Sequence, residues 1–234
     1  MLGSLGEAVR HVLIRSFATM VALVTGVLGG WGPRTVTGMW SAAGLAERVH
    51  WSRAHRFFSR AVWEFDAVGL VLARVVVAAF VPDGGAVTVA VDDTLFHRYG
   101  KTVYGARWQH DGSAKGRDRI GRGTNFVICG IVVAVPFLAR QICLLVLFRL
   151  HIPKGTGKTG SKTAQARGLV DLLATVFAGR RIHVVGDAAY RGPAWRGLPS
   201  DSPSPPAWLP TPCSTGRPRR APASADIRPG RGRG

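Results

Sequence analysis

Apolar side chains in the first 85 residues recur near the 3.6-residue period of an α-helix. The clearest set comprises Leu13, Ile14, Phe17, Val21 and Val24. Residues 51–80 form a longer stretch of the same kind, and no proline interrupts it. Because side chains at this spacing share one face of a helix, the pattern predicts an all-helical region over residues 1–85.

Three arginines within this region are spaced for recognition of DNA. A turn at Gly44 is followed by a predicted helix over residues 46–60, which places Arg53, Arg56 and Arg60 on one face. This arrangement resembles the second helix of a helix-turn-helix, whose side chains contact DNA. A bundle helix with a solvated arginine stripe fits the same residues, so both interpretations stay open.

The hydrophobic period changes after residue 85. Residues 86–93 alternate between valine and other residues, as in a half-buried strand. Residues 125–135 and 140–150 are strongly apolar and indicate two further strands, and residues 181–186 indicate a short fourth one.

A helix is predicted between the third and fourth strands, over residues 161–177. Ser161 or Thr163 fits its N-cap, and Gly179 fits its stop. The last strand must then enter the sheet by a crossover through this helix, which makes the sheet mixed. The predicted fold class is therefore α/β, with a helical N-terminal region before a mixed sheet and crossover helix over residues 86–197.

The last segment, residues 198–234, differs from both regions. It holds nine of the 14 prolines of the chain, with repeated serine, arginine and glycine and few aliphatic residues. Such a composition cannot build a core, which predicts a disordered Pro/Arg-rich tail. An out-of-frame reading of GC-rich DNA would give the same composition.

The charge balance points to a polyanionic partner. The 234 residues carry 31 Lys+Arg against 13 Asp+Glu, a formal net charge of +18, and residues 86–197 carry +11 of it. A field of this sign attracts nucleic acid. The uncharged stretch 16–33 contains four glycines and is a poor membrane span, and no membrane partner is expected. The three cysteines form no C-x-x-C pair, which favours a reducing cytoplasm and, with this charge, association with the nucleoid.

The segment between the first two predicted strands, residues 95–123, is rich in cations and aromatic residues. Its basic residues are Arg98, Lys101, Arg107, Lys115, Arg117, Arg119 and Arg122, and its aromatic residues include Tyr99, Tyr104 and Trp108. Such a surface neutralises phosphates and stacks on bases, so we expect it to contact DNA, with Lys158 in a second basic loop. A solvated loop is the alternative.

Three aspartates lie at the predicted ends of two strands. Asp92 and Asp93 follow one valine-rich strand, and Asp187 follows the last strand. Carboxylates at the ends of buried strands are costly unless a cation compensates for them. If the two strands are neighbours, Asp93 and Asp187 would meet and bind a hard divalent cation. The alternative is that these residues only terminate strands.

Four segments together resemble the DDE-type transposases of bacterial insertion sequences. They are VDDT (91–94), GARWQHD (105–111), NFV (125–127) and RIHVVGDAAY (181–190). The resemblance covers most of residues 34–195 and implies a ribonuclease H-like fold. It also implies that Asp93 is the first catalytic acid, with Asp92 as its alternate, and that Asp187 is the second.

The same resemblance implies a reaction and its participants. Asp93 and Asp187 would bind Mg²⁺ or Mn²⁺ for strand cleavage and transfer, with double-stranded DNA at transposon ends and target as the partner. A homodimer is compatible with this reaction.

The sequence departs from the family at the third acid, a glutamate on a later helix. The glutamates, Glu7, Glu47 and Glu64, all precede Asp93, and Asp201 and Asp226 lie in the proline-rich tail. The expectation is a truncated or frameshifted, catalytically impaired copy with an incomplete ribonuclease H-like sheet. The alternative is a non-catalytic DNA-binding protein that competes for transposon ends.

Overall fold

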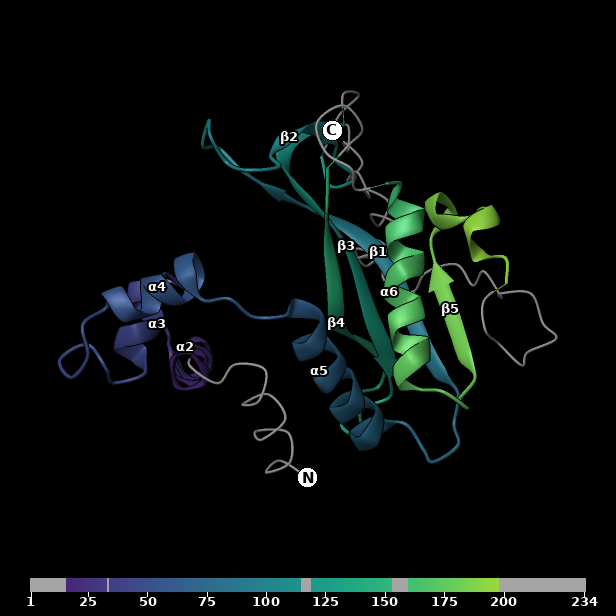
Figure 1. Cartoon of the computed structure of the whole chain (residues 1–234), viewed down its shortest axis with the longest axis horizontal. Coiled ribbons are helices and arrows are strands. Elements are labelled where there is room, and N and C mark those ends of the chain that lie inside the picture. The colour runs from purple at the N-terminus through teal and green to yellow at the C-terminus, as the bar shows by residue number, and fades with distance from the viewer. Residues whose placement is uncertain (1–15, 33, 115–118, 153–159, 198–234) are drawn as a thin grey trace, which may run out of the picture.

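The computed structural model describes residues 16–32, 34–114, 119–152 and 160–197. Helices α2 (Phe17–Gly29), α3 (Val36–Ala42), α4 (Ser52–Arg60) and α5 (Phe65–Phe80) come first. They are followed by β1 (Val87–His97), β2 (Arg107–His110), β3 (Ile120–Val133), β4 (Ile142–His151), α6 (Lys162–Val176), β5 (Ile182–Gly186) and the 3₁₀ turns η1 (Ala188–Tyr190) and η2 (Pro193–Trp195). Figure 1 shows α2, α3 and α4 grouped beside the sheet, with α5 and α6 packed on it.

Helices α2, α3 and α4, called the front helices below, enclose a small core of their own. Leu23, Trp40, Ala54 and Phe57 form its buried centre. The helical prediction is confirmed over the described part of residues 1–85, whereas Leu13 and Ile14 lie outside the described residues. The helix predicted over residues 46–60 begins only at Ser52, because residues 46–48 form a turn. The buried face of α2 consists of Thr19, Leu23 and Gly26. Val21 and Val24 of the expected apolar stripe are exposed, because only a small core lies beneath α2 and its sequence is apolar nearly all round.

The apolar stretch 51–80 is two helices rather than one. Residues 61–64 have no regular secondary structure and separate α4 from α5. Within this break the ring of Trp63 packs 6.0 Å from Phe57 and 4.2 Å from Phe65, measured between ring centroids. The chain breaks here because α4 and α5 pack into different cores, which a continuous rod could not reach.

Helix α5 packs into the core of the sheet, although the sequence predicts it as part of the helical region over residues 1–85. Ala73, Val76 and Val77 share the main core cluster with the strands. A Cβ at Gly69 would lie 2.3 Å from the carbonyl oxygen of Val146, so only glycine allows this close approach to β4. Arg149 of β4 donates to both carboxylate oxygens of Asp66, at 2.6 and 2.7 Å.

The sheet is mixed, as the element order predicts. β1 pairs antiparallel with β3 and parallel with β5. β4 and β2 both pair antiparallel with β3, on successive parts of its length. The order β4-β3-β1-β5, with α6 as the crossover before β5, is that of an RNase H-like fold.

Two features of the strands differ from the prediction. The expectation that Asp92 and Asp93 end their strand is wrong, since β1 continues to His97. Its second half pairs with β3 as far as His97 and Gly123, beyond the end of β5. The short strand β2 lies within the segment expected to be an irregular insert, because its residues find a partner edge on β3.

Helices α5 and α6 contact each other and cover one face of the sheet. On that face Val87, Val89 and Val127 are fully buried, and Leu169 and Leu173 of α6 pack with them. Residues of β1 on the opposite face, such as Thr88 and Asp92, are half-buried or exposed. The two faces therefore give neighbouring residues of β1 different surroundings.

Helix α6 follows its prediction closely. Ser161 is the N-cap and its hydroxyl accepts from the backbone N–H of Ala164 at 3.1 Å, which settles the choice between Ser161 and Thr163. The predicted tail, residues 198–234, lies outside the described residues. None of the helices described is both long enough and apolar enough to cross a bilayer.

Candidate active site

The parallel pairing of β1 and β5 gathers the three candidate aspartates at one end of β5. The last paired residues are Val91 and Gly186. Asp92 follows the first and Asp187 follows the second, so these two leave the paired region at the same level. A Cβ at Gly186 would lie 2.9 Å from Cγ2 of Val91, so the strands approach closely here.

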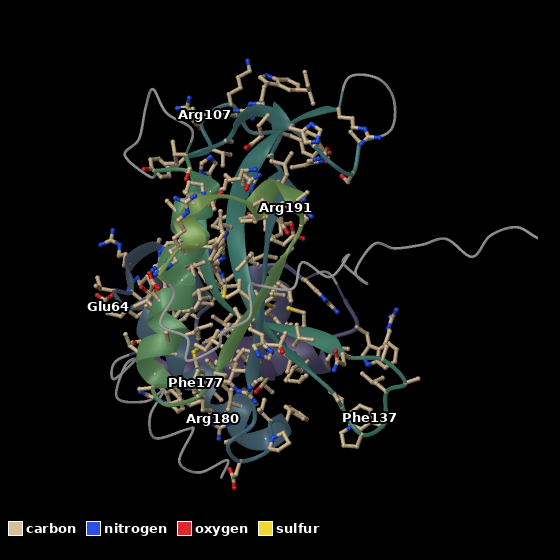
Figure 2. The ribbon with its side chains drawn as sticks, turned by 90° about the vertical axis from the view of Figure 1, so that its right-hand side faces the viewer. Glu64, Arg107, Phe137, Phe177, Arg180 and Arg191 are labelled. Atoms are coloured by element: carbon tan, nitrogen blue, oxygen red, sulfur yellow. The ribbon has the colours of Figure 1, made fainter. Side chains whose placement is uncertain are left out.

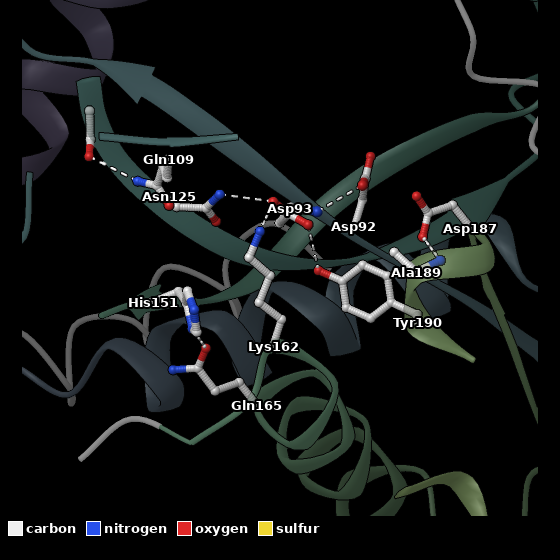
Figure 3. A network of polar contacts seen from close by, with 11 residues as sticks. Asp92, Asp93, Gln109, Asn125, His151, Lys162, Gln165, Asp187, Ala189 and Tyr190 are labelled. Atoms are coloured by element: carbon white, nitrogen blue, oxygen red, sulfur yellow. Dashed lines mark hydrogen bonds and ion pairs between the residues drawn. The ribbon is translucent and has the colours of Figure 1, made fainter. Parts of the chain in front are cut away.

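Asp93 lies one residue further along β1 than Asp92, so its side chain is on the opposite face of the sheet from that of Asp92. It shares the helix-covered face with Val91 and pairs in register with Val127 of β3. Asp93 and Asp187 are expected from the sequence to meet, whereas in the structure the residue of β1 that directly follows the last pair with β5 is Asp92. Figure 3 shows the three aspartates in this order, with Asp92 between the other two in the view.

The Asp93 carboxylate accepts three hydrogen bonds from three different elements. Lys162 Nζ at the start of α6 lies 2.6 Å from Oδ2, and Asn125 Nδ2 of β3 lies 2.8 Å from the same oxygen. The hydroxyl of Tyr190 donates to Oδ1 at 3.2 Å. Burial alone would raise the pKa of Asp93, but the donors Lys162 and Asn125 outweigh it and hold the pKa below its ordinary value.

Asp92 has the opposite electrostatic environment. Its Oδ1 accepts from the backbone N–H of Asp93 at 2.7 Å. Burial is the largest cause that raises its pKa, and the negative charges of Asp93 and Asp187 add to it, so the net shift is upward. Burial, together with the proximity of two other carboxylates, therefore disfavours the ionised form of Asp92.

Asp187 is held by the turn that follows it. Its Oδ1 accepts from the N–H of Ala189 at 2.9 Å and so caps the short helix η1. This turn brings Tyr190 to the Asp93 carboxylate, where its side chain is almost fully buried. Burial is the first cause, and the nearby Asp93 the second, that raise the pKa of Tyr190 well above its ordinary value, so Tyr190 stays a hydrogen-bond donor.

The segment after Asp187 is anchored on α6. Trp195 Nε1 donates to the carbonyl oxygen of Tyr190 at 2.5 Å. The guanidinium of Arg167 donates to the carbonyl oxygens of Ala194, Arg196 and Gly197 at 2.8 to 3.1 Å. These bonds fix Tyr190 and therefore its contact with Asp93.

Asn125 and Tyr190 are site residues to which the sequence assigned no role of their own, and Lys162 was expected to meet phosphate backbone or solvent rather than Asp93. Asn125 and Tyr190 lie within the segments that carry the family resemblance, and this was a usable signal. For Lys162 the only signal was its place beside the N-cap Ser161, in a basic stretch that fits solvent equally well. Its partner Asp93 is 69 residues away in the sequence, so spacing does not connect them.

The candidate DNA contacts on α4 are exposed. Arg53, Arg56 and Arg60 all lie on the surface of the front helices. Arg53 Nε also donates to the hydroxyl of Thr19 on α2 at 3.1 Å. Arg53 therefore ties two helices together, while Arg56 and Arg60 are exposed at the surface.

The cations of the 95–123 segment divide between surface and structure. Arg98, Lys101 and Arg119 are exposed, and Arg107 starts β2 at the end of the molecule away from Phe177 and Arg180 (Figure 2). Lys115, Arg117 and Lys158 lie outside the described residues.

Arg122 is the member of the segment that holds its backbone together. It donates to the carbonyl oxygens of Arg98, Gly100 and Lys101 at 2.7 to 3.2 Å. Three aromatic side chains beside this loop stand out from the surface: Tyr99 is 93% exposed, Tyr104 78% and Trp108 71%. The loop thus presents cations and rings on a fixed backbone, which is a surface suited to nucleic acid.

The donor set at the end of β5 fits a hard divalent cation. Among the residues that the structure describes, no three His, Cys, Asp or Glu side chains converge closely enough to hold a metal ion by themselves. Mg²⁺, however, is commonly bound through one or two carboxylates with water and substrate phosphates completing its shell. Of the charges that act on Asp92, those of Asp93 and Asp187 are negative and that of Lys162, which also pairs with Asp93, is positive, so net negative charge remains for such a cation.

Comparison with known proteins gives a family. Residues 12–233 match the model of the DDE superfamily endonucleases, a range that includes both aspartate-bearing strands. No curated protein and no solved structure matches the chain. The family implies nuclease or transposase activity on DNA, and its members generally use divalent metals. With the match spanning nearly all of its 234 residues, the chain belongs to the DDE superfamily of endonucleases.

Proposed function

We propose that the protein is a DNA transposase of an insertion sequence, whose reaction is metal-dependent strand cleavage and transfer. The observation that carries the proposal is the gathering of Asp92, Asp93 and Asp187 where β1 and β5 part, on an RNase H-like sheet. Chains of this superfamily act on DNA, and the exposed cations supply the attraction to it.

In this proposal Asp93 and Asp187 hold the divalent ion, Mg²⁺ or Mn²⁺. When bound, the ion supplies the charge that activates an attacking water and stabilises the leaving oxygen of a phosphodiester. Asn125 and Tyr190 orient the Asp93 carboxylate through their hydrogen bonds. The capping bond to Ala189 fixes the carboxylate of Asp187 at the end of β5.

Asp92 is the alternate to Asp93 in this role. It follows the last β1 residue paired with β5, as Asp187 follows the last β5 residue paired with β1. Burial first, and then the negative charges of Asp93 and Asp187, raise its pKa. A cation bound between Asp92 and Asp187 would relieve that repulsion. Substitution of each aspartate separately distinguishes the two arrangements.

The 234-residue chain is proposed to cleave DNA poorly. No glutamate follows Asp187 in the sequence, and two-metal chemistry needs both ions about 3.5–4 Å apart. Removal of one member of such a unit commonly lowers the rate by several orders of magnitude. A second candidate function follows from this observation, a non-catalytic DNA-binding protein that competes for transposon ends as a nucleoid-associated monomer or homodimer.

A nicking assay on supercoiled plasmid with Mg²⁺ or Mn²⁺ tests the two functions. Transposase activity predicts slow nicking that Asp93→Asn and Asp187→Asn each abolish. Asp83→Asn is the matched control, because the Asp83 side chain is fully exposed and its ion pair with Arg180 is long, at 3.8 Å. DNA binding without any metal-dependent nicking would favour the competitor. Nicking that survives both aspartate substitutions contradicts the proposed site.

A further inference from the structure

The ammonium of Lys162 lies beside the Asp93 carboxylate, the position that the proposed function gives to a divalent cation. Its Nζ lies 2.6 Å from Oδ2 of Asp93, and about a third of each side chain or less is exposed, 35% for Lys162 and 23% for Asp93. Figure 3 shows the lysine side chain rising from the start of α6 to the carboxylate. A metal ion bound to the same oxygen would compete with the ammonium for it, since both are cations in one small space.

The start of α6 is fixed, so this contact is set by the fold. Ser161 caps the helix directly before Lys162. One turn later, Gln165 donates to the carbonyl oxygen of Leu150 at 3.2 Å and lies 3.0 Å from Nδ1 of His151, both at the end of β4. The helix therefore holds the backbone of Lys162 in place, while its four-carbon side chain can change rotamer without moving the helix.

A DNA phosphate is a second anionic partner for the ammonium of Lys162. If a divalent ion takes Asp93, the ammonium is repelled by it and loses its partner. A lysine at the positive end of a helix, next to metal-bound DNA, then has the phosphodiester backbone as an anion to pair with. Lys162 then changes from a partner of the enzyme's own carboxylate to a partner of the substrate.

We propose that Lys162 is an internal counterion that holds Asp93 in the absence of metal and transfers to a DNA phosphate when the metal binds. The inference rests on the proposed metal site of the preceding section. It assigns to Lys162 a positioning role that links metal occupancy with DNA binding. Coupling of this kind is reciprocal, so DNA must also raise the affinity for metal.

A metal titration of Lys162→Met, followed by melting temperature, tests the competition. Removal of the ammonium is expected to lower the half-saturating Mn²⁺ concentration by about 5- to 150-fold, the range usual for coupled sites. Lys162→Gln, which keeps a polar side chain, should shift it in the same direction. Arg140→Met is the control, because Arg140 is an exposed cation in the loop between β3 and β4 and belongs to neither proposed surface, and it should leave the titration unchanged.

Two results of this titration would overturn the inference. An unchanged half-saturating concentration in both Lys162 variants would mean that the ammonium does not compete. Loss of the metal response in both would mean that Lys162 builds the site instead of occupying it.

Binding of a short DNA duplex, measured at several salt concentrations, tests the transfer to phosphate. Without metal, wild type and Lys162→Met should show the same salt slope, because Asp93 holds the lysine. With Mn²⁺ the wild-type slope should exceed that of the variant by about 0.9, the contribution of one phosphate. Equal slopes in Mn²⁺ would contradict the transfer.

The wild-type titration separates this inference from the proposed function. A wild-type protein whose melting temperature ignores Mn²⁺ and Mg²⁺ would remove the metal site itself, and the proposed function with it. A wild-type response that Asp93→Asn abolishes but Lys162→Met leaves unchanged would remove the inference about Lys162 alone.

Discussion

The acidic end of β5, formed by Asp92, Asp93 and Asp187, and the basic segment of residues 95–123 have contrasting structures. At the acidic end, the charge of Asp93 is enclosed by partners from β3, α6 and η1. In the basic segment, the exposed cations and rings face solvent, and Arg122 fixes only the backbone beneath them. In the proposed function, the first region holds a small ion and the second attracts a large anion along its length.

This contrast has a consequence for any DNA that reaches both regions. Phosphates are attracted to the segment and repelled by the three carboxylates, since like charges disfavour each other. The two regions can serve one duplex only when cations neutralise the acidic end. Four experiments test this contrast.

The largest effect is expected from Asp187→Asn. If the acidic end binds a divalent ion, Mg²⁺ or Mn²⁺ should raise the melting temperature of the wild type, because a ligand of the native state stabilises it by mass action. The substitution should abolish this shift completely, while Asp83→Asn should retain it. A full metal response in Asp187→Asn would show that the acidic end is not the ion site.

Removal of the exposed cations of the basic segment should have the next largest effect. The triple variant Arg98→Gln, Lys101→Gln and Arg119→Gln should bind duplex DNA more weakly, with a salt slope smaller by about 2.7, or about 0.9 for each phosphate. The metal-induced melting shift should be unaffected. A slope equal to that of the wild type would place the DNA on another face of the protein.

Arg122→Met should act on stability instead. The variant loses three hydrogen bonds to carbonyl oxygens of the loop, and we expect a loss of about 1–2 kcal/mol in the free energy of unfolding. Arg119→Met, an exposed neighbour without such bonds, should change it by less than about 0.5 kcal/mol. Equal denaturation midpoints for the two variants would contradict the structural role of Arg122.

The smallest effect concerns Asp111, which anchors the turn after β2. Two hydrogen bonds from Ser113 are the main cause, and the contact with His97 at 2.7 Å a further one, that lower its pKa from 3.8 to about 2. A depressed folded-state pKa contributes stability above the unfolded value, and this is lost as pH falls from about 3.8 through about 2. The stability difference between wild type and Asp111→Asn should therefore shrink over this interval in denaturant titrations at successive pH values. A constant difference would contradict the assignment.

Much of the fold could be predicted because local pattern determines it. The valine alternation gave β1, and Ser161 gave the start of α6. The length of β1 could not be predicted, because residues 94–97 are strand only through their pairing with β3. The break at residues 61–64 depends in the same way on two separate cores.

The site was predictable only in part for a related reason. Acidic residues next to buried valines are visible in the sequence, and Asp93 and Asp187 stand out in that way. Which aspartate reaches the level of Asp187 depends on strand register, and the register places Asp92 there. The Lys162 partnership depends on where the crossover helix begins over the sheet.

Strand β3 runs from the basic segment to the acidic end of β5, and its length sets the distance between them. Its residue Gly123 pairs with both β1 and β2 at the base of the basic segment, and Val127 pairs with Asp93. Four residues of an extended strand span about 14 Å. That length matches about four nucleotide steps along one DNA strand, at about 3.4 Å each. A duplex aligned with β3 and gripped at the base of the segment would thus meet the acidic end about four nucleotides away.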